Sequence, residues 1–148
     1  MHTQSFTNLS QLYSNIVYHE SENYFYDYER YGAHFSTALF YSAEKLDLNL
    51  FKEELRKTDK IVEITDSLFY IIFNMTDIDG GLKATENILS TYEKKHFSQK
   101  VYTSVSSTQS SHQKEFLSTH LFSLLDFAIK ENKYNEVLDD FHDLYSYN

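Results

Sequence analysis

The sequence predicts an α/β (α+β) sandwich in which helices cover a small sheet. Near the middle of the chain, an apolar segment from Leu68 to Phe73 follows the strand-like segment Ile61 to Ile64. Only Thr65, Asp66 and Ser67 separate them, which is the pattern of a β-hairpin. Apolar residues at helical spacing occur on both sides of this hairpin. The return strand is almost wholly apolar, which is typical of a strand covered on both faces.

Two helices and a strand are predicted before the hairpin. Residues 1–8 are polar and are expected to form a flexible tail. A helix is predicted from Leu9 to about Tyr31 because its apolar residues recur at helical spacing, and Gly32 is expected to close it. A strand from Phe35 to Tyr41 follows. The second helix should end near Thr58 and is marked by Leu48, Phe51 and Leu55.

The elements after the hairpin alternate between helix and strand. A loop is expected from Met75 to Gly81, and a third helix from about Ala84 to Tyr92. The weak alternation from Val101 to Ser107 predicts a strand. The segment Glu136 to Tyr145 is expected to form a short last helix. Before it, a fourth helix is lined by Phe116, His120, Leu121, Leu124, Leu125 and Ala128.

The composition indicates one folded domain, assigned to residues 9–148, and excludes several kinds of site. Aromatic residues make up 17% of the 148 residues, and a disordered chain would be poor in them. The absence of cysteine excludes thiolate metal sites, and three glycines are too few for a phosphate-binding glycine loop. A net charge of -9 disfavours nucleic acid and anionic membranes as partners. Because no apolar run approaches 18 residues, a cytoplasmic, unanchored protein is expected.

Some polar and aromatic groups allow more than one interpretation. His19-Glu20 lacks the second histidine of a zinc motif, and Asp77 with Asp79 forms only an incomplete calcium loop. The segment Tyr24 to Tyr31 contains too many aromatic residues for one helix face, so some rings should be exposed. These rings either form a protein interface or belong to ordinary packing with their hydroxyls in water. The sequence leaves both interpretations open.

Several segments resemble a known family in the same order along the chain. They are LSQLYSN (Leu9 to Asn15), YERYGAHFSTALFYSA (Tyr28 to Ala43), DKIVEITDSLFYIIF (Asp59 to Phe73), VYTSVSS (Val101 to Ser107) and LLDFAIKENKYNEV (Leu124 to Val137). Together they resemble diguanylate cyclase domains, the bacterial GGDEF family. The resemblance implies a shortened, nucleotide-cyclase-like fold with a central, mostly antiparallel sheet flanked by helices.

The chain departs from the family at the positions that carry its chemistry. TDSLF stands where GGDEF is expected, so the degenerate signature turn comprises Thr65, Asp66, Ser67, Leu68 and Phe69. The aspartates of the family's first strand fall on Tyr41 and Ala43. Mg²⁺ needs oxygen ligands, and phosphoryl transfer needs carboxylates that hold it. The resemblance therefore implies a pseudoenzyme with no catalytic residue, no metal and no cofactor.

One motif of the family is retained. Arg56 and Asp59 form an RxxD tetrapeptide five residues before TDSLF, the offset of the family's inhibitory site for cyclic di-GMP. An arginine can bind a phosphate or a guanine edge, and an aspartate can accept hydrogen bonds from guanine. The alternative is structural, because Arg56 is expected near a helix end and Asp59 in a turn.

Three functional hypotheses follow. The first is a non-catalytic signalling module that binds an unknown protein partner or itself, with cyclic di-GMP as candidate ligand. The second is a divergent nucleotide-handling enzyme whose metal ligands have moved to positions such as Asp66, Asp77 and Asp79. The third is a purely structural interaction or dimerisation module without a nucleotide ligand. None of the three involves nucleic acid or a membrane as a partner.

Overall fold

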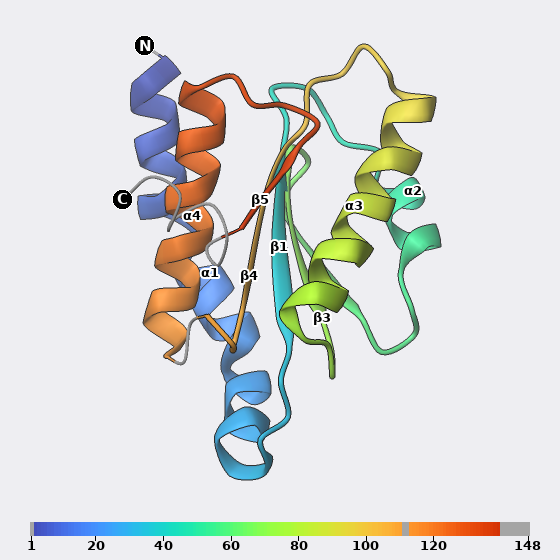
Figure 1. Ribbon diagram of the computed structural model, residues 1–148. Helices are drawn as coiled ribbons and strands as arrows, with labels where there is room; N and C mark the ends of the chain where they lie inside the picture. Colours follow the sequence, from blue (N-terminus) through green and yellow to red (C-terminus); the bar gives the residue numbers. More distant parts are fainter. Residues whose placement is uncertain (1, 111–112, 140–148) are drawn as a thin grey trace.

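The structure, a computed structural model, describes residues 2–110 and 113–139, with side chains from residue 9 onward. A five-stranded sheet lies between two helical layers (Figure 1). The elements are α1 (His2–Tyr31), β1 (Ser36–Tyr41), α2 (Leu48–Glu54), β2 (Lys60–Thr65), β3 (Leu68–Phe73), α3 (Ile78–Lys95), β4 (Tyr102–Ser107), α4 (Lys114–Lys130) and β5 (Val137–Asp139). The predicted α/β class and the order of elements up to α4 are confirmed.

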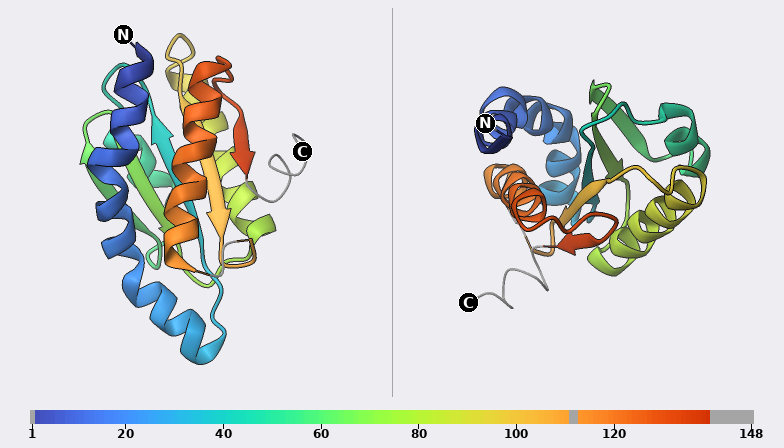
Figure 2. Two further views of the ribbon diagram at one scale, coloured as in Figure 1. Left: turned by 90° about the vertical axis from the view of Figure 1, so that its left-hand side faces the viewer. Right: turned by 90° about the horizontal axis from the view of Figure 1, so that it is seen from above.

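The sheet has the strand order β2-β3-β1-β4-β5. The pairs β2–β3, β3–β1 and β1–β4 are antiparallel, and only β4–β5 is parallel. Helices α1 and α4 cover one face, and α2 and α3 cover the other (Figure 2). The expected central, mostly antiparallel sheet is therefore present. Within the described residues, no helix combines the length and apolarity needed to cross a bilayer.

The apolar return strand of the hairpin, β3, is an interior strand between β2 and β1 and is completely buried, as predicted. Its side chains alternate between the two faces, so Phe69, Ile71 and Phe73 join one core. Leu68, Tyr70 and Ile72 join the other core beneath α1 and α4. The Tyr70 hydroxyl lies 2.6 Å from Ser21 Oγ of α1, and burial raises the pKa of Tyr70 above its ordinary value. The hairpin therefore packs against both helical layers.

Helix α1 closes as the sequence predicts but begins earlier than expected. Gly32 has a φ of +71°, which favours glycine, and its N–H donates to the Tyr28 carbonyl at 2.8 Å. The helix begins at His2, so part of the segment 1–8 has a helical backbone where the sequence predicts a tail. The assignment of residues 9–148 to a single domain stays a prediction.

The start of α3 corrects the predicted loop from Met75 to Gly81. The helix already begins at Ile78, because the Asp77 side chain accepts the Gly80 N–H at 2.8 Å and caps it. Gly81 allows this first turn to lie against β1. A Cβ atom at Gly81 would lie 2.5 Å from Ser36 Cβ, so only glycine fits there. Asp77 and Gly80, which the sequence pattern assigns to a loop, therefore form the cap of α3, and Gly81 lies at the contact between α3 and β1.

Three smaller predictions were wrong. The segment after α4 forms the strand β5 at Val137–Asp139 where a helix from Glu136 to Tyr145 was predicted, and residues 140–145 lie outside the described residues. Helix α2 ends at Glu54, short of Thr58. Phe116 is 51% exposed and therefore does not line the buried face of α4.

Candidate functional site

The signature turn lies at one end of the sheet, at the tip of the β2–β3 hairpin. Asp66 and Ser67 form the turn between the two strands. Leu68 and Phe69 are 0% exposed and belong to the two opposite cores. The Phe69 ring contacts the ring of Phe51 from α2, with 5.1 Å between centroids. Two of the five signature positions thus contribute packing and present no polar group to a ligand.

The backbone of this turn is bonded to the segment that follows β1. The N–H of Ser42 donates to the Ser67 carbonyl at 3.1 Å, and the N–H of Leu46 donates to the Asp66 carbonyl at 2.8 Å. Within the turn, Ser67 N–H donates to Thr65 Oγ1 at 3.1 Å. The two segments therefore lie directly against each other through main-chain hydrogen bonds. These carbonyls are already engaged by the chain itself.

A side-chain network centred on Gln99, called here the Gln99 network, holds the same segment from the α3 side. Gln99 Nε2 donates to Ser42 Oγ at 3.0 Å and to the Lys45 carbonyl at 3.1 Å. Its Oε1 accepts the hydroxyl of Tyr92 at 2.9 Å, and that hydroxyl accepts the N–H of Asp47 at 3.0 Å. Burial raises the pKa of Tyr92, so this hydroxyl stays protonated. The segment after β1 is thus bonded to the signature turn on one side and to Gln99 and Tyr92 on the other.

A side-chain contact between His96 and Asp47 extends the Gln99 network to the end of α3. His96 Nε2 lies 3.0 Å from Asp47 Oδ2, and Asp47 also caps α2 by accepting the Leu50 N–H. The hydrogen bond from His96 lowers the pKa of the Asp47 carboxyl below its ordinary value of 3.8. None of these residues was predicted from the sequence as part of a site. The only available signal was Asp47 directly before the helical pattern, which is a typical N-cap.

The residues at the positions where the sequence resemblance implies metal ligands do not fit a divalent cation. Tyr41 pairs with Leu68 across the β1–β3 register, and Ala43 carries no donor. Burial raises the pKa of Tyr41, which opposes formation of a phenolate. Asp66 is exposed and accepts a hydrogen bond from Ser67 Oγ at 3.2 Å. Among the described side chains, no group of three or more His, Asp or Glu residues could hold a metal ion.

The alternative metal ligands of the enzyme hypothesis do not come together. Asp66 lies at the hairpin tip, whereas Asp77 and Asp79 lie at the start of α3. β3 runs between these two ends of the sheet, and its six residues span roughly 17 Å. Asp77 is also occupied as the helix cap. These three carboxylates therefore cannot coordinate one metal ion in this fold.

The RxxD motif lies at the opposite end of the sheet from the signature turn. The guanidinium of Arg56 contacts both carboxylate oxygens of Asp59, with a shortest bond of 2.8 Å from Nη2 to Oδ1. Asp59 Oδ2 also accepts the backbone N–H of Arg56 at 2.8 Å. The Asp59 side chain is only 3% exposed, against 57% for Arg56. Asp59 therefore orients Arg56, while the guanidinium faces solvent.

Two further bonds fix the guanidinium to the loop after β3. Arg56 Nη2 donates to Thr76 Oγ1 at 2.8 Å and to the Asn74 carbonyl at 3.1 Å. The hydrogen bond to Asp59 raises the pKa of Arg56, so the group stays charged. Within the described part of the chain, Arg56 Nη1 makes none of these bonds. One edge of the guanidinium is therefore available to a ligand.

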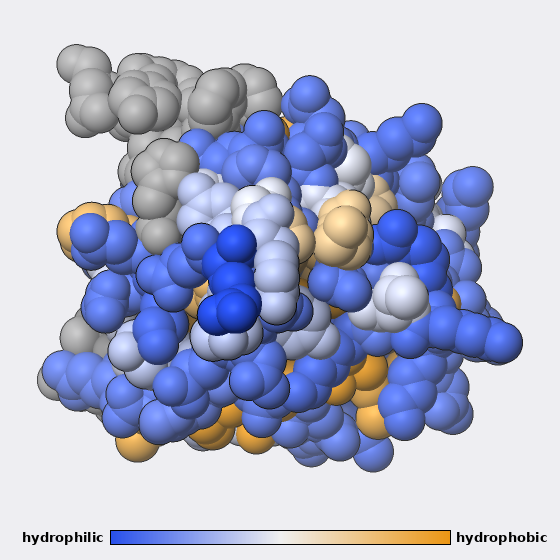
Figure 3. All heavy atoms as spheres, turned by 90° about the horizontal axis from the view of Figure 1, so that it is seen from below, coloured by the Kyte–Doolittle hydropathy of each residue, from blue (hydrophilic) through white to orange (hydrophobic). Residues whose placement is uncertain are grey.

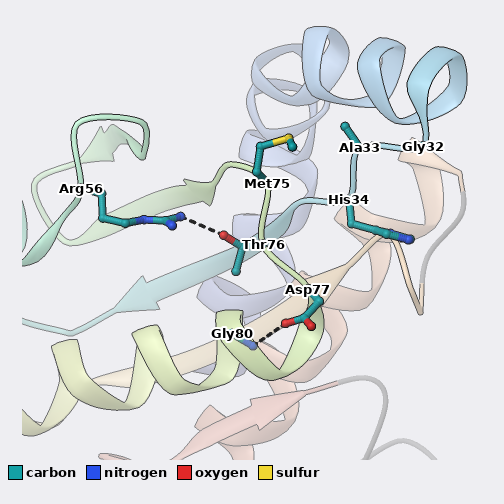
Figure 4. Close-up of a pocket in the computed structure, with 8 residues that line it drawn as sticks. All are labelled: Gly32, Ala33, His34, Arg56, Met75, Thr76, Asp77 and Gly80. Carbon is teal, nitrogen blue, oxygen red and sulfur yellow. Dashed lines mark hydrogen bonds between the residues drawn. The ribbon is translucent and has the colours of Figure 1, made fainter.

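Arg56 lines a pocket of about 480 Å³ between the end of α1, the loop after β3 and the start of α3. Figure 4 shows Arg56 on one side of this pocket and His34 on the other, with Met75 above and Gly80 below. Met75 is 71% exposed. This end of the molecule is mostly hydrophilic, with apolar surface in small separate areas (Figure 3). The site combines one cation with a partly apolar wall.

The aromatic residues of α1 divide between core and surface. Phe25 is 1% exposed, while Tyr26 and Tyr31 are 55% and 70% exposed. Arg30 lies near both exposed rings, and its Nε donates to the Tyr31 hydroxyl at 3.0 Å. The expectation that some of these rings are exposed is confirmed. Whether they form an interface stays a prediction.

Comparison of the sequence with family models and with curated proteins finds no match. The fold does match solved structures. The active GGEEF domain of a diguanylate cyclase from Vibrio cholerae has a TM-score of 0.67 at 13% identity, over 84% of this chain and 94% of that chain. The GGDEF domain of DgcB from Caulobacter crescentus, solved in complex with c-di-GMP, has a TM-score of 0.63 at 11% identity, over 77% and 80%.

A third structure contains a protein partner. Diguanylate cyclase SiaD from Pseudomonas aeruginosa, in complex with its activator SiaC, has a TM-score of 0.61 at 9% identity. The match covers 84% of this chain and 57% of the SiaD chain. These similarities establish that the chain has the nucleotide-cyclase-like α/β fold of GGDEF domains. The fold implied by the sequence resemblance is confirmed.

Proposed function

We propose that this protein is a non-catalytic GGDEF-fold signalling module that acts through protein–protein interaction, with cyclic di-GMP as its candidate regulatory ligand. The observation that carries the proposal is the closed signature turn. Its carbonyls at Asp66 and Ser67 are bonded to the backbone of Leu46 and Ser42. These bonds hold the turn against the segment that follows β1 and engage both carbonyls within the chain.

The donor set at the signature end supports the absence of catalysis. Phosphoryl transfer depends on carboxylates that hold Mg²⁺ against the phosphates. Tyr41, Ala43 and Leu68 stand at the positions that resemble the family's acidic positions, and none of them has a carboxylate. A carboxylate introduced at position 68 would strongly destabilise the fold, because the Leu68 side chain is completely buried.

The pocket at the other end supports a binding role. Arg56 is oriented by Asp59 and directs a free edge of its guanidinium outward, which suits a phosphate or a guanine edge. Because the Asp59 carboxylate already accepts four hydrogen bonds from Arg56, we assign it an orienting role. The related DgcB domain was solved with c-di-GMP, which supports this choice of ligand.

A second candidate is an interaction module that binds no nucleotide. The satisfied Arg56–Asp59 pair favours it, because the pair also bonds the start of β2 to the Asn74 carbonyl and so has a structural role. A net charge of -9 opposes an anionic ligand as well. The SiaD complex with an activator protein supports protein binding under either candidate.

Two measurements on the full chain separate these functions. With Mg²⁺ or Mn²⁺ we expect no turnover of GTP, and measurable turnover would overturn the proposal of a non-catalytic module. In calorimetric titration with cyclic di-GMP, we expect binding that Arg56→Ala abolishes. Lys57→Ala removes a neighbouring exposed cation and should leave the affinity unchanged. No heat with the unmodified protein would favour the module without a nucleotide ligand.

A further inference from the structure

The hydrogen bonds of the Arg56 guanidinium are distributed unevenly over its three nitrogens. An arginine side chain has five N–H donors, one on Nε and two on each Nη. Nε contacts both carboxylate oxygens of Asp59 at 3.2 Å. Nη2 has three acceptors for its two hydrogens, namely Asp59 Oδ1 and Thr76 Oγ1 at 2.8 Å and the Asn74 carbonyl at 3.1 Å. None of these bonds involves Nη1.

This distribution limits how a ligand can contact Arg56. A phosphate or carboxylate that binds a guanidinium with two oxygens needs two parallel N–H donors, from Nε and Nη2 or from Nη1 and Nη2. Both arrangements use a hydrogen of Nη2. Asp59 already occupies the first arrangement, and Thr76 with the Asn74 carbonyl occupies Nη2 in the second. A ligand that leaves these bonds intact therefore reaches only Nη1.

Thr76 takes part in this arrangement without offering a donor of its own to a ligand. It is half-buried and lines the same pocket as Arg56, and Figure 4 shows the bond that joins the two side chains. Its hydroxyl donates to the Asn74 carbonyl at 2.8 Å while it accepts from Arg56 Nη2. Because a hydroxyl has one hydrogen, none is left for an anionic ligand.

We infer that Thr76 is a positioning residue for ligand binding at Arg56. It holds Nη2 against the loop after β3, so that Nη1 alone donates to the ligand. The group that the pocket recognises is then a single phosphate oxygen, bound through one guanidinium nitrogen instead of a two-oxygen fork. This role deepens the proposed function and rests on it, since it requires cyclic di-GMP to occupy the Arg56 pocket.

The two residues that hold the guanidinium come from different segments of the chain. Asp59 lies in the turn before β2, whereas Thr76 lies in the loop between β3 and α3. Arg56 is 57% exposed, and a long exposed side chain loses rotamer freedom when it binds a ligand, which weakens binding. With Asp59 and Thr76 in place, much of that freedom is already lost before a ligand arrives.

Calorimetric titration of full-chain variants with cyclic di-GMP measures the contribution of Thr76. Thr76→Val replaces the hydroxyl with a methyl group of similar size, and Thr76→Ser keeps the hydroxyl. The matched control is Thr119→Val on α4, where the hydroxyl donates to the Glu115 carbonyl of its own helix. We expect Thr76→Val to weaken binding about fivefold or more, and Thr76→Ser and Thr119→Val to change it less than about twofold.

Nuclear magnetic resonance of the guanidinium tests the positioning role without a ligand. The chain has only two arginines, Arg30 and Arg56, so Arg56→Ala assigns the Arg56 signals. The Nη2 hydrogens should exchange with water more slowly than the Nη1 hydrogens. Thr76→Val should speed the exchange of the Nη2 hydrogens, and Thr76→Ser should preserve their protection. A purely structural role of Thr76 would lower the free energy of unfolding but leave this difference between Nη1 and Nη2 unchanged.

The outcomes separate the role of Thr76 from the proposed function. Unchanged or tighter binding by Thr76→Val, while Arg56→Ala abolishes binding, would overturn the positioning role and leave cyclic di-GMP as the ligand. Equal exchange rates at Nη1 and Nη2 in the unmodified protein would overturn it as well. Absence of binding by the unmodified protein would overturn both the role of Thr76 and the choice of ligand. None of these outcomes affects the GTP test of the proposed function.

Discussion

Introducing a carboxylate at Leu68 tests the interpretation of the signature turn most directly. Leu68→Glu introduces an acidic side chain at a position that resembles an acidic position of the GGDEF signature. If the position were a vacated metal site, the protein would tolerate the change and gain affinity for Mg²⁺. Leu68 is instead 0% exposed and packs under α1 and α4. We therefore expect the substitution to damage the fold and restore no activity.

The magnitude follows from burial. Removing a buried leucine side chain costs about 2–5 kcal/mol, which Leu68→Ala should show alone. A carboxyl group without a partner adds a desolvation penalty, so Leu68→Glu should cost about 4 kcal/mol or more. Total stabilities of small domains are about 5–15 kcal/mol. The variant should retain little of its free energy of unfolding at neutral pH.

The pH dependence of the stability of Leu68→Glu tests the same reasoning independently. Burial raises the pKa of a carboxyl group in the folded state. The variant should therefore be most stable at low pH, where the introduced group is protonated in both states. It should lose stability as the pH rises through the raised pKa. The unmodified protein lacks this ionisable group at position 68.

Urea denaturation followed by circular dichroism measures these differences at several pH values. Ser67→Asp is the matched control, because Ser67 lies in the turn and is only half-buried. It should change the free energy of unfolding by less than about 1 kcal/mol. A Leu68→Glu protein that is as stable as the control and binds Mg²⁺ would refute the reasoning.

Three further predictions concern the contacts that position the two ends of the sheet. Gly81→Ala should destabilise the protein by about 1–3 kcal/mol in urea denaturation, because the new Cβ would lie 2.5 Å from Ser36 Cβ. Gly80→Ala is the control and should cost less, because its new Cβ would meet only side-chain atoms at 3.0 Å or more. Tyr92→Phe should cost about 1–2 kcal/mol by the same measurement, since it leaves the Asp47 N–H and Gln99 without their shared partner; an unchanged midpoint would contradict the role of the Gln99 network. His96→Ala should reduce stability near neutral pH, because it removes the hydrogen bond that lowers the pKa of Asp47. That interaction stabilises the fold only while the Asp47 carboxyl is ionised, so the difference in stability from the unmodified protein should shrink as the pH falls below about 4. Acid titration followed by circular dichroism checks this last prediction, and a difference that grows in acid would contradict it.

The fold was predictable from the sequence because its main signals are local. The hairpin was evident from two apolar segments around Thr65, Asp66 and Ser67, and Gly32 marked the end of α1. β5 was missed because three residues carry no periodicity of their own, and its identity as a strand depends on pairing with β4. The start of α3 was missed because Asp77 and Gly80 are equally common in turns and in helix caps.

The candidate site was predictable only as a set of positions. The sequence identified Arg56 and Asp59 by their RxxD spacing, and in the structure their side chains contact each other. It could not tell whether Asp59 faces a ligand or Arg56, because that depends on the 3% exposure of the Asp59 side chain. The Gln99 network could not be predicted from the sequence for the same reason. Its members are separated by up to 57 residues and meet only through tertiary packing.

The register between β1 and β3 explains why single substitutions should not create a metal site at the end of these strands. Tyr41 and Leu68 are direct cross-strand partners, and both pack in the core beneath α1 and α4. Two carboxylates at these positions would lie within about 5 Å of each other and repel unless a cation joined them. One carboxylate alone would be buried beside an apolar or aromatic neighbour. Each step towards a metal site at these two positions should therefore destabilise this fold.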